Sequence, residues 1–380
     1  MRLAIITTHP IQYYAPVFKL LAQKIDLMVF YTWGEASMAK HDPGFGRTIK
    51  WDIDLLDGYN YQWVNNKARD PGTHHFIGID NPDLISQITN WQPDELLVYG
   101  WAFKSHLSTM RHFKNKIPVL FRGDSTLLDE KPGFKNLLRA FYLRWVYKYI
   151  DYALYTGTNN KAYFKKYGLS EKQLIFVPHS VDNERFANQR TNEVAALKQQ
   201  LNISHDDLIV LFAGKLEKKK DPEALLRSFI NLAAPGVHLL FVGNGFLEKS
   251  LKERAARSEN IHFMDFQNQN IMPVVYQACD IFCLPSAGPG ETWGLAVNEA
   301  MACAKAILAS DKVGCAVDLV NNEVNGCIHE ANSEVSLSEK LSLLIYKTKQ
   351  ELSAMGLKSA QFIKNWDINI QADNIVNYKR

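Results

Sequence analysis

The sequence predicts an α/β protein built from two doubly wound, Rossmann-like domains. Its 380 residues exceed what one hydrophobic core usually supports and suit two domains of ordinary size. Short apolar segments alternate with helical patterns in both halves, which is typical of βαβ units around a parallel sheet. A hydrophobic fraction of 47% and a charged fraction of 22% are those of a folded globular chain.

Each half contains a series of short apolar runs that we expect to be buried strands. In the first half they are Leu3–Thr7, Leu27–Tyr31, Glu95–Tyr99, Val119–Arg122, Tyr152–Tyr155 and Leu174–Val177. In the second half they are Leu208–Ala213, Val237–Val242, Ile261–Phe266, Ile281–Leu284 and Ala306–Ala309. Helices are expected at Pro222–Leu232, Leu247–Arg257, Pro273–Ala278, Leu295–Ala302 and Ser333–Tyr346.

A polar stretch near Val181–Asn192 marks the expected domain boundary. We therefore expect an N-terminal domain over residues 1–182, a C-terminal domain over 183–355 and a final helical segment over 356–380. Ligands of open parallel sheets bind outside the carboxyl ends of the strands, so the loops that follow the strands are where we expect chemistry.

Composition argues against several classes of function. The net charge of +3 is too small to predict nucleic-acid binding, which needs a concentrated basic surface. No segment reaches the roughly 18–20 apolar residues of a membrane span, and the N-terminus does not resemble a signal peptide. Five cysteines without a paired metal-ligand spacing favour a reducing compartment. We expect a cytoplasmic protein, with the inner face of the cytoplasmic membrane as a possible peripheral location.

The loop after Ile281–Leu284 is rich in glycine and leads directly into the helix expected at Leu295. Gly288, Gly290 and Gly294 would let the backbone approach a ligand closely, and a helix N-terminus offers N–H groups to phosphate. The alternative is a plain glycine-rich turn whose acidic residues favour the helix dipole by about 0.3–1 kcal/mol each.

A second loop, Phe212–Lys220, carries four lysines between a strand and a helix that opens with Asp221-Pro222. Cations at the end of a strand could compensate a diphosphate leaving group through charge-assisted hydrogen bonds of about 1.5–3 kcal/mol each. The alternative is a solvated charge run. A third loop, Gly243-Asn244-Gly245, would form a close wall of the same pocket.

Together these motifs resemble glycosyltransferase family 4, a group of retaining enzymes with the GT-B architecture. The resemblance covers the C-terminal half almost continuously. The matching residues are Gly214-Lys215-Leu216 with Lys220, Gly243-Asn244-Gly245, Glu291 through Glu299-Ala300-Met301-Ala302, Pro178–Asp182 and Asn365-Trp366-Asp367. It implies two Rossmann-like domains facing an interdomain cleft, with the segment 356–380 packing back on the N-terminal domain.

The resemblance also implies roles for individual residues. Glu299 would hold the ribose hydroxyls, Glu291 would lie by the donor sugar and the reacting carbon, and Lys215 and Lys220 would bind the diphosphate. Lys215 stands where the family more often has Arg, which keeps the charge but loses bidentate geometry. Further donor contacts are expected from Gly214, Gly243, Gly290, Trp293, Gly294 and Leu295.

The N-terminal half departs further from the family. His9 and Gln12 follow the first strand and could contact the acceptor, or could form a helix cap and staple. Trp101 stands near where many relatives carry a histidine, and we expect it and Arg122 to contact the acceptor. Asp124 is the candidate for acceptor positioning or proton transfer, with a simple Asp-Ser turn as the alternative.

The stretch 132–151 combines bulky apolar and basic side chains at helical spacing. Such a helix could lie against an anionic membrane. The alternative is a core helix whose Arg and Lys side chains reach out to solvent.

The function predicted from these features is transfer of a hexose-type sugar from a nucleotide diphosphate sugar to a hydroxyl of a glycan or lipid-linked acceptor, with retention at the anomeric carbon. Its place would be in the synthesis of cell-surface polysaccharide or glycoconjugates. We expect no cofactor and no metal, and we interpret Asp52-Ile53-Asp54 as a surface turn. The alternatives are another GT-B enzyme, such as a sugar-nucleotide epimerase or a phosphorylase-like enzyme, and a non-catalytic nucleotide-sugar-binding protein.

Overall fold

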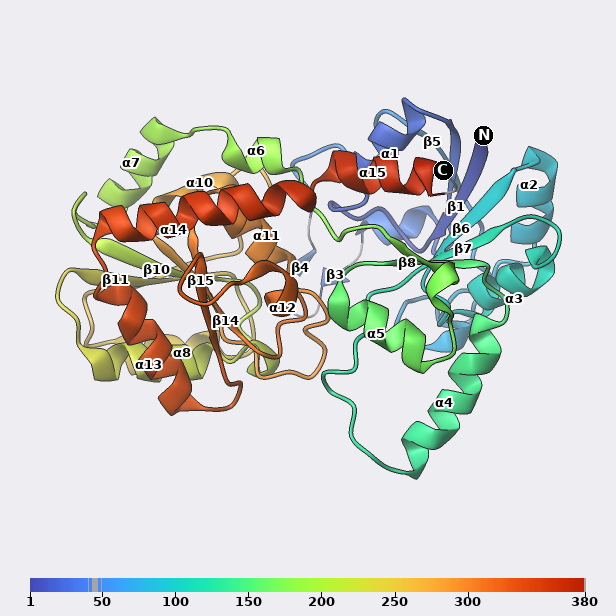
Figure 1. Cartoon of the computed structure of the whole chain (residues 1–380). Coiled ribbons are helices and arrows are strands. Elements are labelled where there is room, and N and C mark those ends of the chain that lie inside the picture. The colour runs from blue at the N-terminus through green and yellow to red at the C-terminus, as the bar shows by residue number, and fades with distance from the viewer. Residues whose placement is uncertain (40, 43–46, 49, 379–380) are drawn as a thin grey trace. The chain divides into compact units, whose positions relative to one another are not determined.

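The computed structural model describes residues 1–39, 41–42, 47–48 and 50–378 (Figure 1). The chain divides into two compact units. The first comprises Met1–Lys40, Ile49–His179 and Ile368–Arg380, and the second comprises His41–Thr48 and Ser180–Asp367. Each unit contains its own parallel sheet, so the predicted α/β architecture of two Rossmann-like domains is confirmed.

The first unit is organised around a seven-stranded sheet in the order β5-β2-β1-β6-β7-β8-β9, and every neighbouring pair is parallel. Its strands are β1 (Arg2–Thr7), β2 (Asp26–Tyr31), β5 (Asn60–Trp63), β6 (Glu95–Tyr99), β7 (Val119–Arg122), β8 (Tyr152–Tyr155) and β9 (Leu174–Phe176). Its helices are α1 (Ala15–Ala22), α2 (Leu84–Trp91), α3 (Lys104–Phe113), α4 (Phe134–Tyr147), α5 (Thr158–Lys166) and α15 (Ile368–Asn377), with short 3-10 turns at η1 (Glu35–Ala39), η2 (Phe76–Gly78) and η3 (Glu171–Gln173).

Both faces of this sheet are covered, and β1 shows how the sequence achieves it. Leu3 and Ile5 pack on one face with α1 and α15, whereas Ala4 and Ile6 pack on the other with α2 to α5. This alternation is the period of two that a strand imposes on its side chains. The last helix, α15, lies beside α1 and buries Ala372 and Ile375 in the same core (Figure 1).

The second unit is organised around a six-stranded parallel sheet in the order β12-β11-β10-β13-β14-β15. Its strands are β10 (Leu208–Ala213), β11 (Val237–Val242), β12 (Ile261–Met264), β13 (Ile281–Leu284), β14 (Ala306–Ser310) and β15 (Gly326–His329). Its helices are α6 (Asn183–Ala187), α7 (Thr191–Gln200), α8 (Pro222–Leu232), α9 (Glu248–Ala255), α10 (Met272–Ala278), α11 (Leu295–Ala302), α12 (Ala316–Leu319), α13 (Glu334–Ile345) and α14 (Lys349–Phe362), with 3-10 turns at η4 (Lys218–Lys220) and η5 (Ile363–Asn365). A short antiparallel pair, β3 (His41–Asp42) and β4 (Arg47–Thr48), is grouped with this unit.

Helix α8 begins where the sequence predicts. Asp221 accepts a hydrogen bond from the Ala224 backbone N–H at 3.2 Å, and Pro222 occupies the first helical position. The two residues therefore fix the end of the lysine loop that precedes the helix.

Within the described residues, no helix has both the length and the apolar content needed to span a bilayer.

Candidate functional site

The glycine loops of the second unit pack backbone against backbone at the carboxyl ends of β10 and β11. A Cβ atom on Gly243 would lie 2.2 Å from the Gly214 carbonyl oxygen, and a Cβ atom on Gly245 would lie 2.5 Å from the Leu216 oxygen. The Gly214 N–H donates to the Val242 oxygen at 3.0 Å. Because no side chain fits between them, the two loops form a thin backbone wall at the carboxyl edge of the sheet, the edge at which ligands bind in open parallel sheets.

The loop that leads into α11 is clamped by the loop after β14. The Gly314 N–H donates to the Glu291 oxygen at 3.0 Å and the Cys315 N–H to the Trp293 oxygen at 2.9 Å. A Cβ atom on Gly314 would lie 1.8 Å from the Thr292 oxygen, so only glycine permits this approach. The segment from Glu291 to Trp293 is thereby held in one conformation.

Gly294 is the N-cap residue of helix α11, and its φ of 96° lies in the left-handed region that favours glycine. Among the described residues, no side chain caps this helix. The first N–H groups of a helix have no partner within it and carry the positive end of the dipole. The start of α11, next to half-buried Leu295, therefore has the chemistry of an anion site.

Lys220 and Glu291 form an ion pair of 2.5 Å between Nζ and Oε2, with side-chain exposures of only 17% and 8%. The Ser286 hydroxyl also donates to Glu291 Oε2 at 3.0 Å, and the Ser310 hydroxyl donates to the Ser286 carbonyl oxygen at 2.5 Å. The structure thus brings together a cation and a carboxylate from two separate strand-end loops. The Ala287 N–H bond to the Lys219 oxygen at 2.9 Å ties the same two loops together.

Glu299 lies just over one turn inside α11 and is almost fully buried, at 3% exposure. The Tyr276 hydroxyl of α10 donates to Glu299 Oε2 at 2.7 Å. Nearby, the Trp293 indole N–H donates to the Asn298 side-chain oxygen at 2.9 Å, which fixes Trp293 against helix α11. Lys215 is half-buried in the loop after β10, and Gly290 is exposed in the loop after β13. The predicted donor residues therefore all belong to strand-end loops of one sheet or to α11.

The first unit contains a pocket of about 180 Å³ at the carboxyl edge of its sheet. Arg122 and Asp124 line it together with Tyr14, Tyr99 and His179, and the remaining lining comes from Thr7, Thr8, Ile11, Gly100, Phe103, Gly123 and Thr156. Burial raises the pKa of Tyr99 to about 12. Burial is also the main cause that lowers the pKa of His179, so this imidazole is neutral near pH 7.

The other residues predicted on the acceptor side have different positions. Arg122 is buried and donates to two backbone oxygens, those of Val177 at 2.8 Å and Pro178 at 2.9 Å. Trp101 packs edge-on against Tyr142 of α4, with ring centroids 5.5 Å apart. His9 and Gln12 are partly buried and are not among the residues that line the pocket. The structure therefore brings Asp124 and Arg122 to one pocket and leaves Trp101, His9 and Gln12 outside its lining.

Asp54 lies in a turn, because its Oδ1 accepts from the backbone N–H groups of Leu56 at 2.9 Å and Asp57 at 3.2 Å. This is the hydrogen-bond pattern of an Asx turn, which agrees with the interpretation of residues 52–54 as a surface turn.

Three residues near these sites were not anticipated from sequence. Tyr276 has no motif, and its role follows only from its contact with Glu299. His179 lies in the segment Pro178–Asp182, whose resemblance to the family could have pointed to it. His106 is fully buried, with Nδ1 2.8 Å from the Gly100 oxygen and Nε2 2.8 Å from the Thr32 hydroxyl. Burial lowers the pKa of His106 to about 4, so the ring is neutral and its Nδ1–H donates to Gly100.

A sequence profile of known proteins decides the family of the second unit. The profile described as "Glycosyl transferases group 1" matches residues 193–359. Residues 193–359 belong to the group 1 glycosyl transferases. This group 1 domain contains Lys215, Lys220 and the whole segment from Glu291 to Glu299.

Two curated relatives support the assignment of the group 1 domain. The chain is 26% identical over 219 residues to a D-inositol 3-phosphate glycosyltransferase of Segniliparus rotundus, covering 55% of this chain and 47% of that protein. It is also 26% identical over 247 residues to the N,N'-diacetylbacillosaminyl-diphospho-undecaprenol alpha-1,3-N-acetylgalactosaminyltransferase of Campylobacter jejuni, covering 63% of this chain and 64% of that protein. The matches thus span about half to two thirds of these relatives.

Solved structures support the fold of the whole chain. The crystal structure of HepE from Anabaena in complex with UDP and glucose superposes with a TM-score of 0.74 and 16% sequence identity, covering 100% of this chain and 99% of that one. WaaG, a glycosyltransferase involved in lipopolysaccharide biosynthesis, superposes with a TM-score of 0.68 and 14% identity, covering 99% of each chain. The protein that carries this group 1 domain therefore has the GT-B fold.

Proposed function

We propose that this chain is a retaining glycosyltransferase that moves a hexose-type sugar from a nucleotide diphosphate sugar to a hydroxyl of a glycan or lipid-linked acceptor. The observation that carries the proposal is the buried Lys220–Glu291 ion pair beside the uncapped start of α11. A cation and a helix N-terminus suit a diphosphate, and a carboxylate between them suits sugar hydroxyls. The group 1 profile over the same residues supports this interpretation.

In the proposed complex the diphosphate lies at the N–H groups of Gly294 and Leu295, with Lys215 and Lys220 as its cations. Lys220 can serve Glu291 and a phosphate together, because an ammonium group has three donors. Gly214, Gly243 and Gly290 leave room for the ligand next to backbone. Trp293 shapes the approach to the helix.

Glu299 is proposed to accept hydrogen bonds from the ribose hydroxyls. The Tyr276 hydroxyl donates to Glu299 Oε2 and so orients this carboxylate. In this arrangement Tyr276 is a positioning residue, since it would act through Glu299 and not on the nucleotide itself.

The proposed reaction breaks the bond between the anomeric carbon and the diphosphate oxygen and forms a bond to the acceptor oxygen on the same face of the sugar. The bonding electrons leave with the diphosphate, whose charge Lys215, Lys220 and the dipole of α11 stabilise. The acceptor's proton passes to the departing phosphate oxygen, so atoms and charge balance. The positive groups of the chain supply the electrostatic compensation, and the proposed chemistry is independent of a metal ion and of a cofactor.

Asp124 is proposed to position the acceptor hydroxyl, because it is an exposed carboxylate at the rim of the first unit's pocket. Arg122 contributes by holding the backbone of residues 177 and 178, which precede the pocket residue His179. His9, Gln12 and Trp101 remain predictions as acceptor contacts. The pocket's mixture of aromatic and hydroxyl side chains suits a sugar ring, which has both apolar and polar faces.

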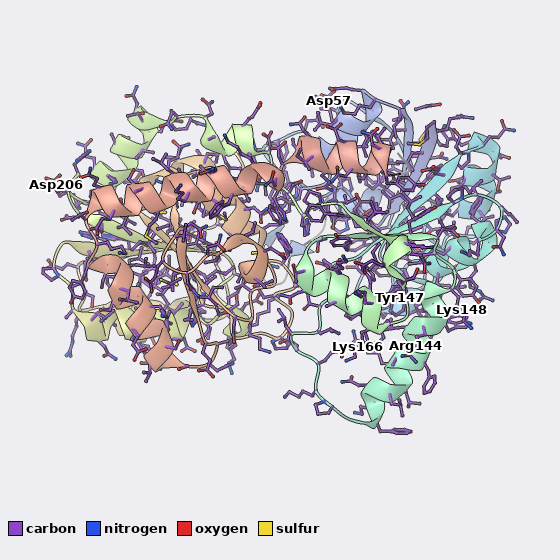
Figure 2. All side chains as sticks on the ribbon, in the orientation of Figure 1. Asp57, Arg144, Tyr147, Lys148, Lys166 and Asp206 are labelled. Carbon is purple, nitrogen blue, oxygen red and sulfur yellow. The ribbon has the colours of Figure 1, made fainter. Side chains whose placement is uncertain are left out.

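A peripheral membrane contact through residues 132–151 is part of the proposal. The exposed face of α4 carries Phe134, Leu137, Leu138, Phe141 and Tyr142, and Phe134 and Phe141 are 72% and 62% exposed. Arg144 lies in the last turn of α4 and Lys148 is the C-cap residue of this helix, whereas Tyr147 is buried in the core (Figure 2). An apolar stripe with neighbouring cations suits an anionic lipid surface, which would present a lipid-linked acceptor at the inner face of the cytoplasmic membrane.

Liposome flotation tests the membrane contact. The protein should float with vesicles that contain anionic lipid and not with neutral ones, and Phe134→Ser with Phe141→Ser should abolish flotation. Tyr346→Ser is the matched control, because Tyr346 is a 68% exposed aromatic residue of the other unit. Protein that stays in solution with anionic vesicles would refute the contact.

A donor screen tests the catalytic proposal. One nucleotide diphosphate sugar should raise the melting temperature, and at 100 times its Kd the stabilisation is about 2.7 kcal/mol. With an acceptor present, transfer should occur with retention and should persist in a chelator. Formation of an epimer without acceptor would establish the epimerase alternative, and binding without any turnover would establish a binding protein.

A further inference from the structure

The loop between β5 and α2 brings three metal-ligating side chains together, away from the residues used above. The carboxylate Oδ2 of Asp70 lies 3.1 Å from His74 Nε2 and 3.2 Å from His75 Nε2. The three ligand atoms all lie within 4.8 Å of one another. Two imidazole nitrogens and one carboxylate oxygen therefore converge on one point.

The base of this loop is closed by one asparagine. Asn66 Oδ1 accepts from the backbone N–H groups of Ala68 at 3.1 Å and Asp80 at 2.9 Å, and Asn66 Nδ2 donates to the Gly78 oxygen at 2.9 Å. The Lys67 N–H also donates to the Asp80 oxygen at 2.8 Å. These bonds join the two ends of the segment that carries the three ligands.

Two glycines let the loop fold tightly around the histidines. A Cβ atom on Gly72 would lie 2.5 Å from His74 Nδ1, and a Cβ atom on Gly78 would lie 2.3 Å from the Gly72 oxygen. The Gly72 N–H donates to the Gly78 oxygen at 3.0 Å. The His74 ring therefore lies against bare backbone, and its Nε2 is directed to Asp70.

We propose that Asp70, His74 and His75 form a binding site for a divalent transition-metal ion, with Zn²⁺ as the best-suited ion. Imidazole nitrogens select Zn²⁺ and its neighbours over Mg²⁺ and Ca²⁺, which prefer oxygen ligands. Each histidine would bind as a neutral ring through Nε2, with its proton on Nδ1, so the hydrogen bonds to Asp70 are replaced by metal bonds. Asp70 and His74 are exposed, which leaves the remaining coordination positions open to water.

The loop is linked to the pocket of the first unit by a chain of hydrogen bonds. Asn81 Nδ2, at the end of the loop, donates to the Thr32 oxygen at 2.9 Å and the Asn65 oxygen at 3.0 Å. The Thr32 hydroxyl contacts His106 Nε2, and His106 Nδ1 donates to the Gly100 oxygen, which lines the pocket. Metal binding would thus order a loop that is connected to the pocket wall.

The test is Zn²⁺ binding to the whole chain, freed of any affinity tag and stripped with a chelator. Calorimetry should show one equivalent of Zn²⁺ bound, and Mg²⁺ at the same concentration should give no heat. His74→Ala, His75→Ala and Asp70→Asn should each weaken Zn²⁺ binding at least tenfold. Hydrogen exchange of residues 66–80 should slow when Zn²⁺ is added to the native chain and should not change in these variants.

His205→Ala is the matched control, because His205 is an exposed histidine 3.5 Å from one carboxylate, that of Asp206, and does not belong to a cluster of three metal-ligating side chains among the described residues. It should leave Zn²⁺ affinity unchanged. The proposal is overturned if no Zn²⁺ binds, or if the three ligand variants bind it as the native chain does. Failure of the proposed function would be seen in a different measurement, because that proposal concerns nucleotide-sugar binding and turnover and not Zn²⁺ binding. If a chelator slows transfer in the native chain but not in His74→Ala, the effect comes from this loop and not from the reacting centre.

Discussion

The Lys220–Glu291 pair makes a quantitative prediction about the stability of the second unit. Replacing Lys220 with Met removes the cation from a carboxylate of 8% exposure, to which, within the part of the chain that the structure describes, the Ser286 hydroxyl still donates. Breaking a buried ion pair by removing one partner costs about 3–5 kcal/mol. Since Lys220 retains 17% exposure and water can reach the gap, we expect the lower end, about 3 kcal/mol.

A double-mutant cycle isolates the interaction between the two side chains. Glu291→Gln keeps an acceptor for Ser286 but removes the charge, so the combination with Lys220→Met leaves no unpaired charge. The losses in the free energy of unfolding caused by the two single changes should therefore add up to at least about 1 kcal/mol more than the loss caused by the double change. Urea unfolding gives the free energies, and hydrogen exchange of peptides from residues 281–302 assigns the loss to this unit.

Lys219 provides the control from the same 3-10 turn. It pairs with Glu217 at 3.3 Å, but the side chains are 42% and 31% exposed. Lys219→Met should cost less than about 1 kcal/mol, as exposed ion pairs do. If Lys220→Met is no more costly than Lys219→Met, or if the cycle is additive, the pair is not the buried interaction on which the proposed site rests.

Further predictions concern ligand binding, local packing and pH. Glu299→Ala should abolish measurable nucleotide-sugar binding, and Tyr276→Phe should weaken this binding by about tenfold, which is the effect of losing one hydrogen bond to a charged group. Calorimetry measures the affinities, and equal affinity of both variants and the native chain would contradict the prediction. Gly314→Ala should lower the melting temperature and the donor affinity together, because its Cβ would lie 1.8 Å from the Thr292 oxygen; unchanged values would mean that this contact is easily relieved. The pKa of His106 is lowered from 6.5 in the unfolded chain to about 4 in the folded chain. Between these pH values the unfolded chain binds a proton at His106 and the folded chain does not. The contribution of this residue to the free energy of unfolding is therefore fully present above about pH 6.5 and falls by roughly 3 kcal/mol as the pH drops to 4. His106→Gln should reduce the number of protons taken up on unfolding between pH 4 and 6.5 by about one, as measured by the pH dependence of the free energy of unfolding. An identical pH dependence in the variant would contradict the lowered pKa of His106.

Much of the fold could be predicted because buried parallel strands are short, continuous apolar runs. The strands β6, β7, β8, β10, β11 and β13 begin and end at the predicted residues. The sequence does not predict strand β5, because Asn60 and Gln62 interrupt its apolar pattern. As β5 lies at the edge of the sheet, its outer side can stay exposed, and the strand needs no continuous apolar run. Strand β12 ends at Met264 and not at Phe266, because the Asn244 side chain accepts from the Phe266 N–H and donates to Asp265, which draws these residues from the ladder.

The candidate site was predictable in its loops but not in its contacts. Glycines at strand ends and a lysine run before an N-cap are local signals, and they indicate the loops that the structure brings together at the carboxyl edge of the sheet. The pairing of Lys220 with Glu291 joins residues that are far apart in the chain, so no spacing rule contains it. Arg122 shows the same limit, since a basic residue at a strand end looked available to a ligand but holds two backbone carbonyls.

The position of α15 has a consequence for how the protein is made. The first unit is discontinuous in sequence, because α15 supplies part of its core from residues 368–377 after the whole second unit has been synthesised. During translation the second unit can therefore complete its core first, whereas the first unit must wait with the apolar residues under α15 uncovered. Exposed apolar surface on such an intermediate favours aggregation. Chains released before residue 368 are thus expected to need chaperones, although they would already carry every residue of the proposed donor site.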